Sequence, residues 1–147
     1  MQLRYRPFGL KLRRFLWSQP CLALLPECGW LDGGCLILRD ALVQWGNGYL
    51  HPGASHRTHR SITFVDHGFA WLDVMGHRLF IDGDGIQEES AFKEKLAVLQ
   101  QHPTVDLRFD TSTERVVGIP VDPDASRTLA QLLSRRLGGF SPSLLTK

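Results

Sequence analysis

The segment from Cys35 to Trp45 constrains the fold more than any other part of the chain, because it is apolar on almost every side of a helix. Its main face carries four residues at helical spacing, which are Cys35, Leu38, Leu42 and Trp45. A helix that is hydrophobic all round is buried in a protein core. Gly46, Asn47 and Gly48 follow, and such residues tolerate the backbone on which helices commonly end. The sequence therefore predicts a central helix over 35–45, against which the other elements pack.

Two strands are predicted after this helix. Residues 61–75 are rich in Ile, Thr, Phe, Val and Trp, the residue types that favour strands. Gly76-His77 offers a turn into a second, shorter strand over 78–82. A tight turn between two such runs predicts an antiparallel pair.

The other segments predict shorter elements. Asp122-Pro123 supplies a cap and a first-turn proline for a final helix over 124–137, which Gly138-Gly139 ends. The remaining expectations are a helix over 91–101 capped by Ser90, a hairpin of 105–109 with 114–121, and loops over 18–34 and 46–60. The sum is an α+β fold in one domain, residues 1–147, with a buried helix packed on an antiparallel sheet.

Basic and apolar residues alternate near the N-terminus. The cations of this segment are Arg4, Arg6, Lys11, Arg13 and Arg14. Alternation is typical of a half-exposed strand, here around residues 2–6 or 10–16. We interpret the cations as the solvated face of that strand, and the alternative is a basic patch for an anionic partner. Because Arg13 and Arg14 interrupt the apolar residues, the segment does not match a secretory signal.

The charge of the chain is nearly balanced, with 17 Lys and Arg against 15 Asp and Glu among 147 residues. A net charge of +2 gives no general attraction to nucleic acid, so we expect no nucleic-acid partner. Apolar runs such as Cys35–Leu38 are far shorter than the ~20 residues of a membrane span. We therefore expect no membrane span and a cytoplasmic location, with signal-independent secretion or delivery into a host cell as the alternative.

Three cysteines, Cys21, Cys28 and Cys35, lie seven residues apart. An odd number without a secretory signal argues against a disulfide framework. A metal site could combine Cys28 and Cys35 with histidines of the following segment, His51, His56 or His59. Zinc sites usually contain a close Cys-x2-4-Cys or His-x3-5-His pair. His51, His56 and His59 do offer histidine spacing, but they lie in a stretch with Gly, Pro and Ser that is typical of an exposed loop. We expect neither a metal nor another cofactor, and interpret Cys21, among leucines, as a buried thiol.

Cys35, His67 and Asp82 form the most informative group of residues. Cys35 stands in the first turn of the predicted helix, where free N–H groups and the positive end of the helix dipole stabilise a thiolate. Gly33-Gly34 lets the backbone approach closely and leaves room for a substrate. With the turn placed between residues 74 and 75, His67 and Asp82 lie opposite each other on neighbouring strands.

Such a group can act as a nucleophilic relay. The helix presents the thiol of Cys35, His67 takes its proton, and Asp82 fixes the tautomer and orientation of the imidazole. The backbone N–H of Cys35 supplies one hydrogen bond to an oxyanion, and Gln19 and Trp30 are candidates for a second donor.

The order of these motifs resembles the papain-like cysteine hydrolase superfamily. Gly-Gly-Cys35 opens a helix, His67 precedes a strand that contains Trp71, and Asp82 closes the next strand. The likeness is greatest to the transglutaminase-like branch, and Ile-Asp82-Gly-Asp-Gly-Ile also resembles small bacterial and phage papain-fold proteins. The resemblance covers residues 28–87.

The resemblance implies a papain-like core and a cysteine hydrolase or acyltransferase that acts on a peptide, isopeptide or glutamine carboxamide bond. In this interpretation Cys35 is the nucleophile, His67 the base and then the acid, and Asp82 the orienting residue. The partner is a protein or peptide substrate, and the residues expected to contact it are Trp30, Gly34 and Trp71.

Three alternatives stay open at this point. The chain could be a catalytically inactive papain-fold module, such as a phage or mobile-element inhibitor or adaptor, that docks through its basic N-terminal strand. It could also bind nucleic acid through Arg4–Arg14 and Arg57–Arg60. Asp84 competes with Asp82 for the orienting role, but Asp84-Gly85 is typical of a turn, so we interpret Asp84 as structural.

Overall fold

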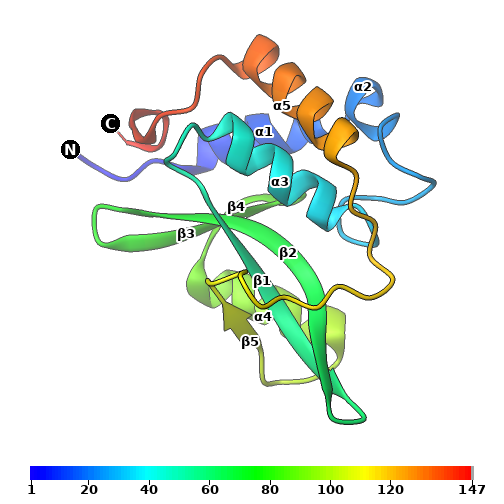
Figure 1. Cartoon of the computed structure of the whole chain (residues 1–147). Helices are drawn as coiled ribbons and strands as arrows, with labels where there is room; N and C mark the ends of the chain where they lie inside the picture. Colours follow the sequence, from blue (N-terminus) through cyan, green and yellow to red (C-terminus); the bar gives the residue numbers. More distant parts are fainter. Residues whose placement is uncertain (147) are drawn as a thin grey trace.

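The computed structural model describes residues 1–146, which form one antiparallel five-stranded sheet with helices on both faces (Figure 1). The elements are α1 (Arg6–Leu16), α2 (Gln19–Leu22), α3 (Cys35–Trp45), β1 (His51–His59), β2 (Ile62–Val74), β3 (His77–Asp82), β4 (Gly85–Glu88), α4 (Glu89–Gln100), β5 (Asp106–Arg108), α5 (Pro123–Leu137) and the 3-10 helix η1 (Pro142–Leu145). The strand order is β4-β3-β2-β1-β5. This arrangement confirms the α+β class. None of the helices in residues 1–146 is both long and apolar enough to cross a membrane.

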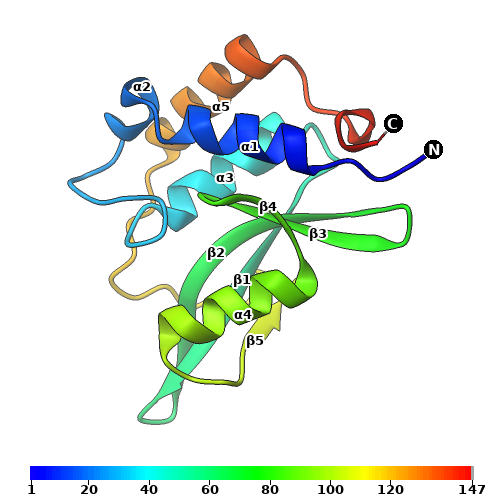
Figure 2. The same ribbon diagram turned by 180° about the vertical axis from the view of Figure 1, so that it is seen from behind.

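Helix α3 has the predicted bounds and lies at the centre of the fold, between the sheet and α5, while α1 packs on β4 on the same face of the sheet (Figures 1 and 2). Its residues Ile37, Leu38 and Leu42 belong to one large core that also contains side chains from α1, α5, β2 and β3. Each fully buried aliphatic side chain of this kind contributes roughly 2 kcal/mol. The all-round apolar pattern of this helix is therefore explained by its neighbours on both sides.

The N-terminal segment forms a helix, so the predicted strand is wrong. In α1 the side chains Phe8, Leu12 and Leu16 recur every four residues and pack into the core beside α3. Pro7 fits the first turn, where its missing N–H costs nothing. The same residues fit both an alternating strand pattern and a helical pattern, so the sequence was ambiguous. Burial of the apolar residues that recur every four positions favours the helix over the strand.

Residues 51–59 form the strand β1 and not the predicted loop. This strand pairs with β2 along its whole length and with β5 through Ala54, Ser55 and His56. The polar composition of residues 51–59 gives only a weak local preference for a strand, so the sequence did not indicate β1. Hydrogen bonds to two neighbouring strands outweigh this weak preference. The predicted strand at 114–121 is also wrong, since β5 takes β1 as its partner and residues 114–121 form no strand.

The hairpin of β2 and β3 is confirmed, with a turn one residue later than expected. Met75 (φ 53°) and Gly76 (φ 78°) form a two-residue turn that is closed by the pair Val74 and His77. Positive φ at both central residues is the geometry that matches the twist of a hairpin. The turn thereby shifts the pairing of the two strands by two residues relative to the prediction.

Helix α4 covers the other face of the sheet (Figure 2). Phe92 of α4 stacks on Phe80 with ring centroids 4.6 Å apart and meets Phe69 edge to face at 5.0 Å. Ser90 lies inside α4 and does not cap it, because the helix already begins at Glu89. At α5, in contrast, Asp122 caps the helix as predicted by accepting a hydrogen bond from the Ala125 N–H at 3.0 Å.

Candidate functional site

Cys35 is the first residue of α3, and its side chain is buried with 3% exposure. The first N–H groups of a helix have no acceptor within the helix, so they face the same region as the thiol. Gly34 precedes them for a packing reason: a Cβ there would lie 2.6 Å from Leu25 Cδ2 and 2.9 Å from the Gly29 carbonyl oxygen. This close packing fixes where the chain turns into α3 and therefore where the thiol lies.

His67 and Asp82 meet from neighbouring strands. The Nε2 atom of His67 lies 2.9 Å from Oδ2 of Asp82, and both side chains are almost fully buried. The expected register is wrong by two residues, because the strands are closed by Val74 and His77 around the two-residue turn. The two side chains are diagonal neighbours on one face, and long side chains can reach each other across that distance.

The surroundings of His67 favour its charged form. Burial lowers the pKa of His67, but hydrogen bonds with Asp82 and Cys35 and their negative charges outweigh burial and raise the pKa to about 9. Burial also disfavours the charged form of Asp82 and so raises its pKa, but the contacts with His67 and Lys95 outweigh burial and lower the pKa to about 2. Since Nε2 is engaged by Asp82, Nδ1 is the ring nitrogen left for the thiol. The site can hold an imidazolium between a carboxylate and a cysteine.

Lys95 of α4 is a further partner of Asp82 that the sequence analysis did not identify. Its Nζ atom donates to Asp82 Oδ2 and, at 2.7 Å, to Gln87 Oε1, and it lies 3.3 Å from Asp84 Oδ2. The backbone N–H of Asp84 donates to the other oxygen of Asp82 at 2.9 Å. Both oxygens of this buried carboxylate are therefore held in place. The sequence did contain a signal for this position of Lys95. Residues 92 and 95 are three apart, so Lys95 shares one face of the predicted helix with the apolar Phe92.

Residues 110–119, which we call the covering segment, close the site over Cys35. The Val65 N–H donates to the Arg115 carbonyl oxygen at 2.9 Å. Arg39 Nη1 donates to both carboxylate oxygens of Glu114, at 3.0 and 2.9 Å. Ile119 packs against the apolar cluster that contains Cys35. Cys35 is only 3% exposed with this segment in place, so we expect the segment to move when a substrate reaches the thiol.

The three residues expected to contact a substrate lie in different environments. Trp30 is fully buried, and its Nε1–H donates to the Leu16 carbonyl oxygen at 2.6 Å, so it is a core residue and no oxyanion donor. Gly34 is buried under the side chain of Leu25. Trp71 is half-buried, and the guanidinium of Arg78 lies 4.3 Å above its ring. Only Trp71 presents part of its side chain to solvent.

Three further side chains, of Asp84, Gln19 and Asp32, lie outside the group of Cys35, His67 and Asp82. Asp84 contacts Lys95 in the turn between β3 and β4, in agreement with its interpretation as a turn residue. Gln19 lies exposed on α2. Asp32 accepts a hydrogen bond from the Gly29 N–H within the loop before α3.

Two buried polar atoms at the irregular pairing between β1 and β2 have no hydrogen-bond partner within residues 1–146. They are Ser55 Oγ and His56 Nδ1. Ser55 is the pairing partner of His67, so its hydroxyl lies on the same face of the sheet. An unpaired buried polar group costs about 1–3 kcal/mol and therefore calls for a partner such as a ligand. The sequence analysis missed Ser55 because it expected a loop there.

The cysteines and histidines do not gather around a common point. In the described part of the chain, no group of three His, Cys, Asp or Glu residues could hold a metal ion. The three cysteines are free; Cys21 is buried, as interpreted, and Cys28 is half-buried. Burial raises the pKa of Cys28, with further contributions from the charges of Asp32 and Cys35.

Comparison of the chain with protein-family descriptions, with curated protein sequences and with solved structures gives no match. The function is therefore inferred from the geometry of the site.

Proposed function

We propose that the protein is a cysteine hydrolase or acyltransferase with a papain-like core, in which Cys35 is the nucleophile, His67 the acid and base, and Asp82 the orienting residue. The observation that carries the proposal is the buried contact of 2.9 Å between His67 and Asp82 beside the first turn of α3. A carboxylate that holds one nitrogen of an imidazole aims the other nitrogen at the nucleophile. The raised pKa of His67 supports an imidazolium that can donate a proton.

The reaction follows from these positions. The Cys35 thiolate attacks the carbonyl carbon of a peptide, isopeptide or glutamine carboxamide, so that an S–C bond forms. The C–N bond then breaks as His67 donates the proton of its Nδ1 atom to the leaving nitrogen. Neutral His67 next removes a proton from water or from an acceptor amine, which attacks the thioester. The S–C bond breaks, and the thiolate and imidazolium are restored.

The negative oxygen of the intermediate needs hydrogen-bond donors. The backbone N–H of Cys35 is one, since the first residue of α3 has no acceptor within the helix. The unpaired hydroxyl of Ser55, on the same face as His67, is our candidate for the second. This role would also provide the partner that the buried hydroxyl lacks.

A second candidate function, an inactive papain-fold module that acts by protein contact, is favoured by one observation. The thiol of Cys35 is 3% exposed beneath the covering segment, which is a poor position for a nucleophile. A binding module could keep the fold without ever opening this segment. The two candidates therefore differ in whether Cys35 reacts.

Reaction with p-nitrophenyl acetate tests the proposal, because this small ester needs little room and no knowledge of the natural substrate. We expect an acetyl group on Cys35, located by mass mapping, followed by its slow hydrolysis and repeated release of p-nitrophenol. Cys35→Ser should lose this turnover, and His67→Ala should reduce it by about a hundredfold or more. Cys28→Ser is the matched control and should keep the turnover of p-nitrophenyl acetate. An unacetylated Cys35 in the folded protein would contradict the enzyme proposal.

A further inference from the structure

The exposed side of α1 gathers cations that have no acidic partner. Lys11, Arg13 and Arg14 are exposed on α1, and Arg136 lies near them at the end of α5. Within residues 1–146, none of these four forms an ion pair. Residues 1–26 contain no Asp or Glu at all. The positive charge of this face is therefore uncompensated by the chain itself.

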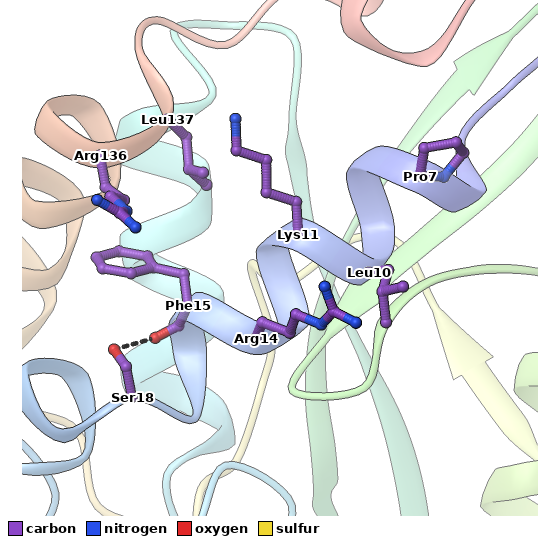
Figure 3. A pocket seen from close by; sticks show the side chains of 8 residues that line it. All are labelled: Pro7, Leu10, Lys11, Arg14, Phe15, Ser18, Arg136 and Leu137. Carbon is purple, nitrogen blue, oxygen red and sulfur yellow. Dashed lines mark hydrogen bonds between the residues drawn. The ribbon is translucent and has the colours of Figure 1, made fainter.

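A hollow of about 450 Å³ lies between α1 and the end of α5 (Figure 3). Figure 3 shows Lys11 and Arg136 on two sides of it, with the apolar side chain of Leu137 between them and the ring of Phe15 below Arg136. Arg14 points the other way, toward Leu10. The hollow thus combines cations at its edge with an apolar floor.

Two further hollows lie beside this one and share exposed residues of α1 with it. One, of about 410 Å³, shares Pro7 and Lys11 with it and extends toward η1. The other, of about 420 Å³, shares Leu10 and Arg14 and extends to Trp17. We call the three together the basic groove. At its far end the Trp17 Nε1–H donates to the Gly83 carbonyl oxygen at 2.7 Å, directly after Asp82 in the chain.

We propose that the basic groove binds an acidic peptide segment of a partner protein, with carboxylates on Lys11, Arg14 and Arg136 and apolar side chains on the floor. Arg side chains bind carboxylates with two parallel hydrogen bonds, which makes Asp and Glu suitable partners. The exposed parts of Leu10 and Trp17 add apolar contacts along the groove.

The shape and composition of the groove favour a peptide over other anions. A flat bilayer cannot fill a concave hollow, so it would not reach the apolar side chains of Phe15 and Leu137 that line it. The phosphate backbone of a nucleic acid would use the cations but not the apolar floor. A chain that carries both carboxylates and apolar side chains uses both.

This inference goes beyond the proposed function and does not depend on it. The groove is built from α1, α5 and η1, and none of its lining residues belongs to the Cys35, His67 and Asp82 group. Binding is therefore measured with Cys35→Ser, in which the proposed chemistry is impossible. A failure of peptide binding and a failure of catalysis are then separate results.

The test is fluorescence anisotropy with a fluorescein-labelled synthetic peptide made of Glu, Ser and Leu. A second peptide with Gln in place of every Glu is the matched probe. We expect the Glu peptide to bind at least tenfold more tightly than the Gln peptide, and its affinity to fall as NaCl is raised, because exposed ion pairs are screened by salt. Equal affinity for the two peptides would overturn the proposal.

Variants locate the binding. Arg14→Glu with Arg136→Glu should weaken binding of the Glu peptide at least tenfold, and Arg14→Gln alone should weaken it less. The control, Lys93→Glu with Arg60→Glu, makes the same change in net charge at exposed positions outside the groove and should alter affinity less than twofold. Equal losses in the two double variants would contradict a specific groove. Binding of phosphatidylserine vesicles or of a single-stranded oligonucleotide, without binding of the Glu peptide, would also overturn the proposal.

Discussion

His67 and Lys95 contact the same atom, Oδ2 of the buried Asp82, from two different elements of the fold. His67 belongs to strand β2, and Lys95 belongs to α4, the helix that covers one face of the sheet. One carboxylate therefore lies between two cations, and His67 in turn hydrogen-bonds with Cys35. The two cations and the N–H of Asp84 satisfy the carboxylate of Asp82, which explains how this site tolerates its burial.

Replacing Lys95 removes one of these cations. We expect Lys95→Met to lower the free energy of unfolding by about 1–3 kcal/mol, because Asp82 loses a hydrogen bond to a charged donor while it remains buried. Urea unfolding at neutral pH measures this. Lys93→Met, which removes only an exposed i,i+4 pair with Glu89, should change it by less than about 0.5 kcal/mol. Equal losses in the two variants would show that Lys95 does not support Asp82.

The pKa of His67 predicts a pH dependence of stability. The pKa is raised from 6.5 to about 9 in the folded protein, so the stabilisation is fully present below pH 6.5 and is lost as the pH rises through 9. The free energy of unfolding should fall over this window by up to about 3 kcal/mol. Urea unfolding across the window measures the fall, and His67→Gln should remove most of it. An unchanged slope in the variant would assign the effect to other groups.

The covering segment predicts a change in access to Cys35. Ile119→Ala removes apolar contact with the cluster that contains Cys35 and should raise the rate of iodoacetamide labelling of Cys35 by about fivefold, which corresponds to roughly 1 kcal/mol of closing energy. Mass mapping follows the reaction at one site. Val117→Ala lies in the same segment with its side chain exposed and serves as the control. The same acceleration in both variants would mean that Ile119 does not close the site.

The turn into α3 predicts a sharp difference between two glycines. Gly34→Ala places a Cβ against Leu25 and the Gly29 carbonyl, and it should lower the free energy of unfolding by about 1–3 kcal/mol. Gly139→Ala meets no atom within 4 Å and should leave it unchanged. Thermal unfolding of the two variants checks this. A stable Gly34→Ala protein would contradict the packing described before α3.

Local signals in the sequence were enough for some elements. Helix α3 is apolar on almost every side and has glycines before and after it. Helix α5 begins with a capping residue, Asp122, and a proline, and both act on the adjacent backbone alone. The α1 and β1 segments could not be predicted, because the first depends on packing beside α3 and the second on hydrogen bonds to β2 and β5. Where local preference is weak, tertiary contacts decide the structure.

Some residues of the candidate site could likewise be predicted from the sequence, and others could not. The order of Cys35, His67 and Asp82 along one helix and two strands indicated that they could meet, and a register error of two residues did not separate them. The spacing of Lys95 from Phe92 indicated the helix face on which Lys95 lies, but its contact with Asp82 depends on how α4 crosses the sheet. Ser55 could not be assigned, since its position depends on the irregular pairing of β1 with β2.

The central claim is that His67 activates Cys35 as a nucleophile, and iodoacetamide labelling of Cys35 at neutral pH tests it most directly. Mass mapping follows the reaction at this one residue, and the protein with an intact His67 is compared with His67→Ala. Because the thiolate and not the thiol is the nucleophile, we expect Cys35 to be labelled at least tenfold more slowly in His67→Ala. Equal labelling rates of Cys35 in the two folded proteins would contradict the claim.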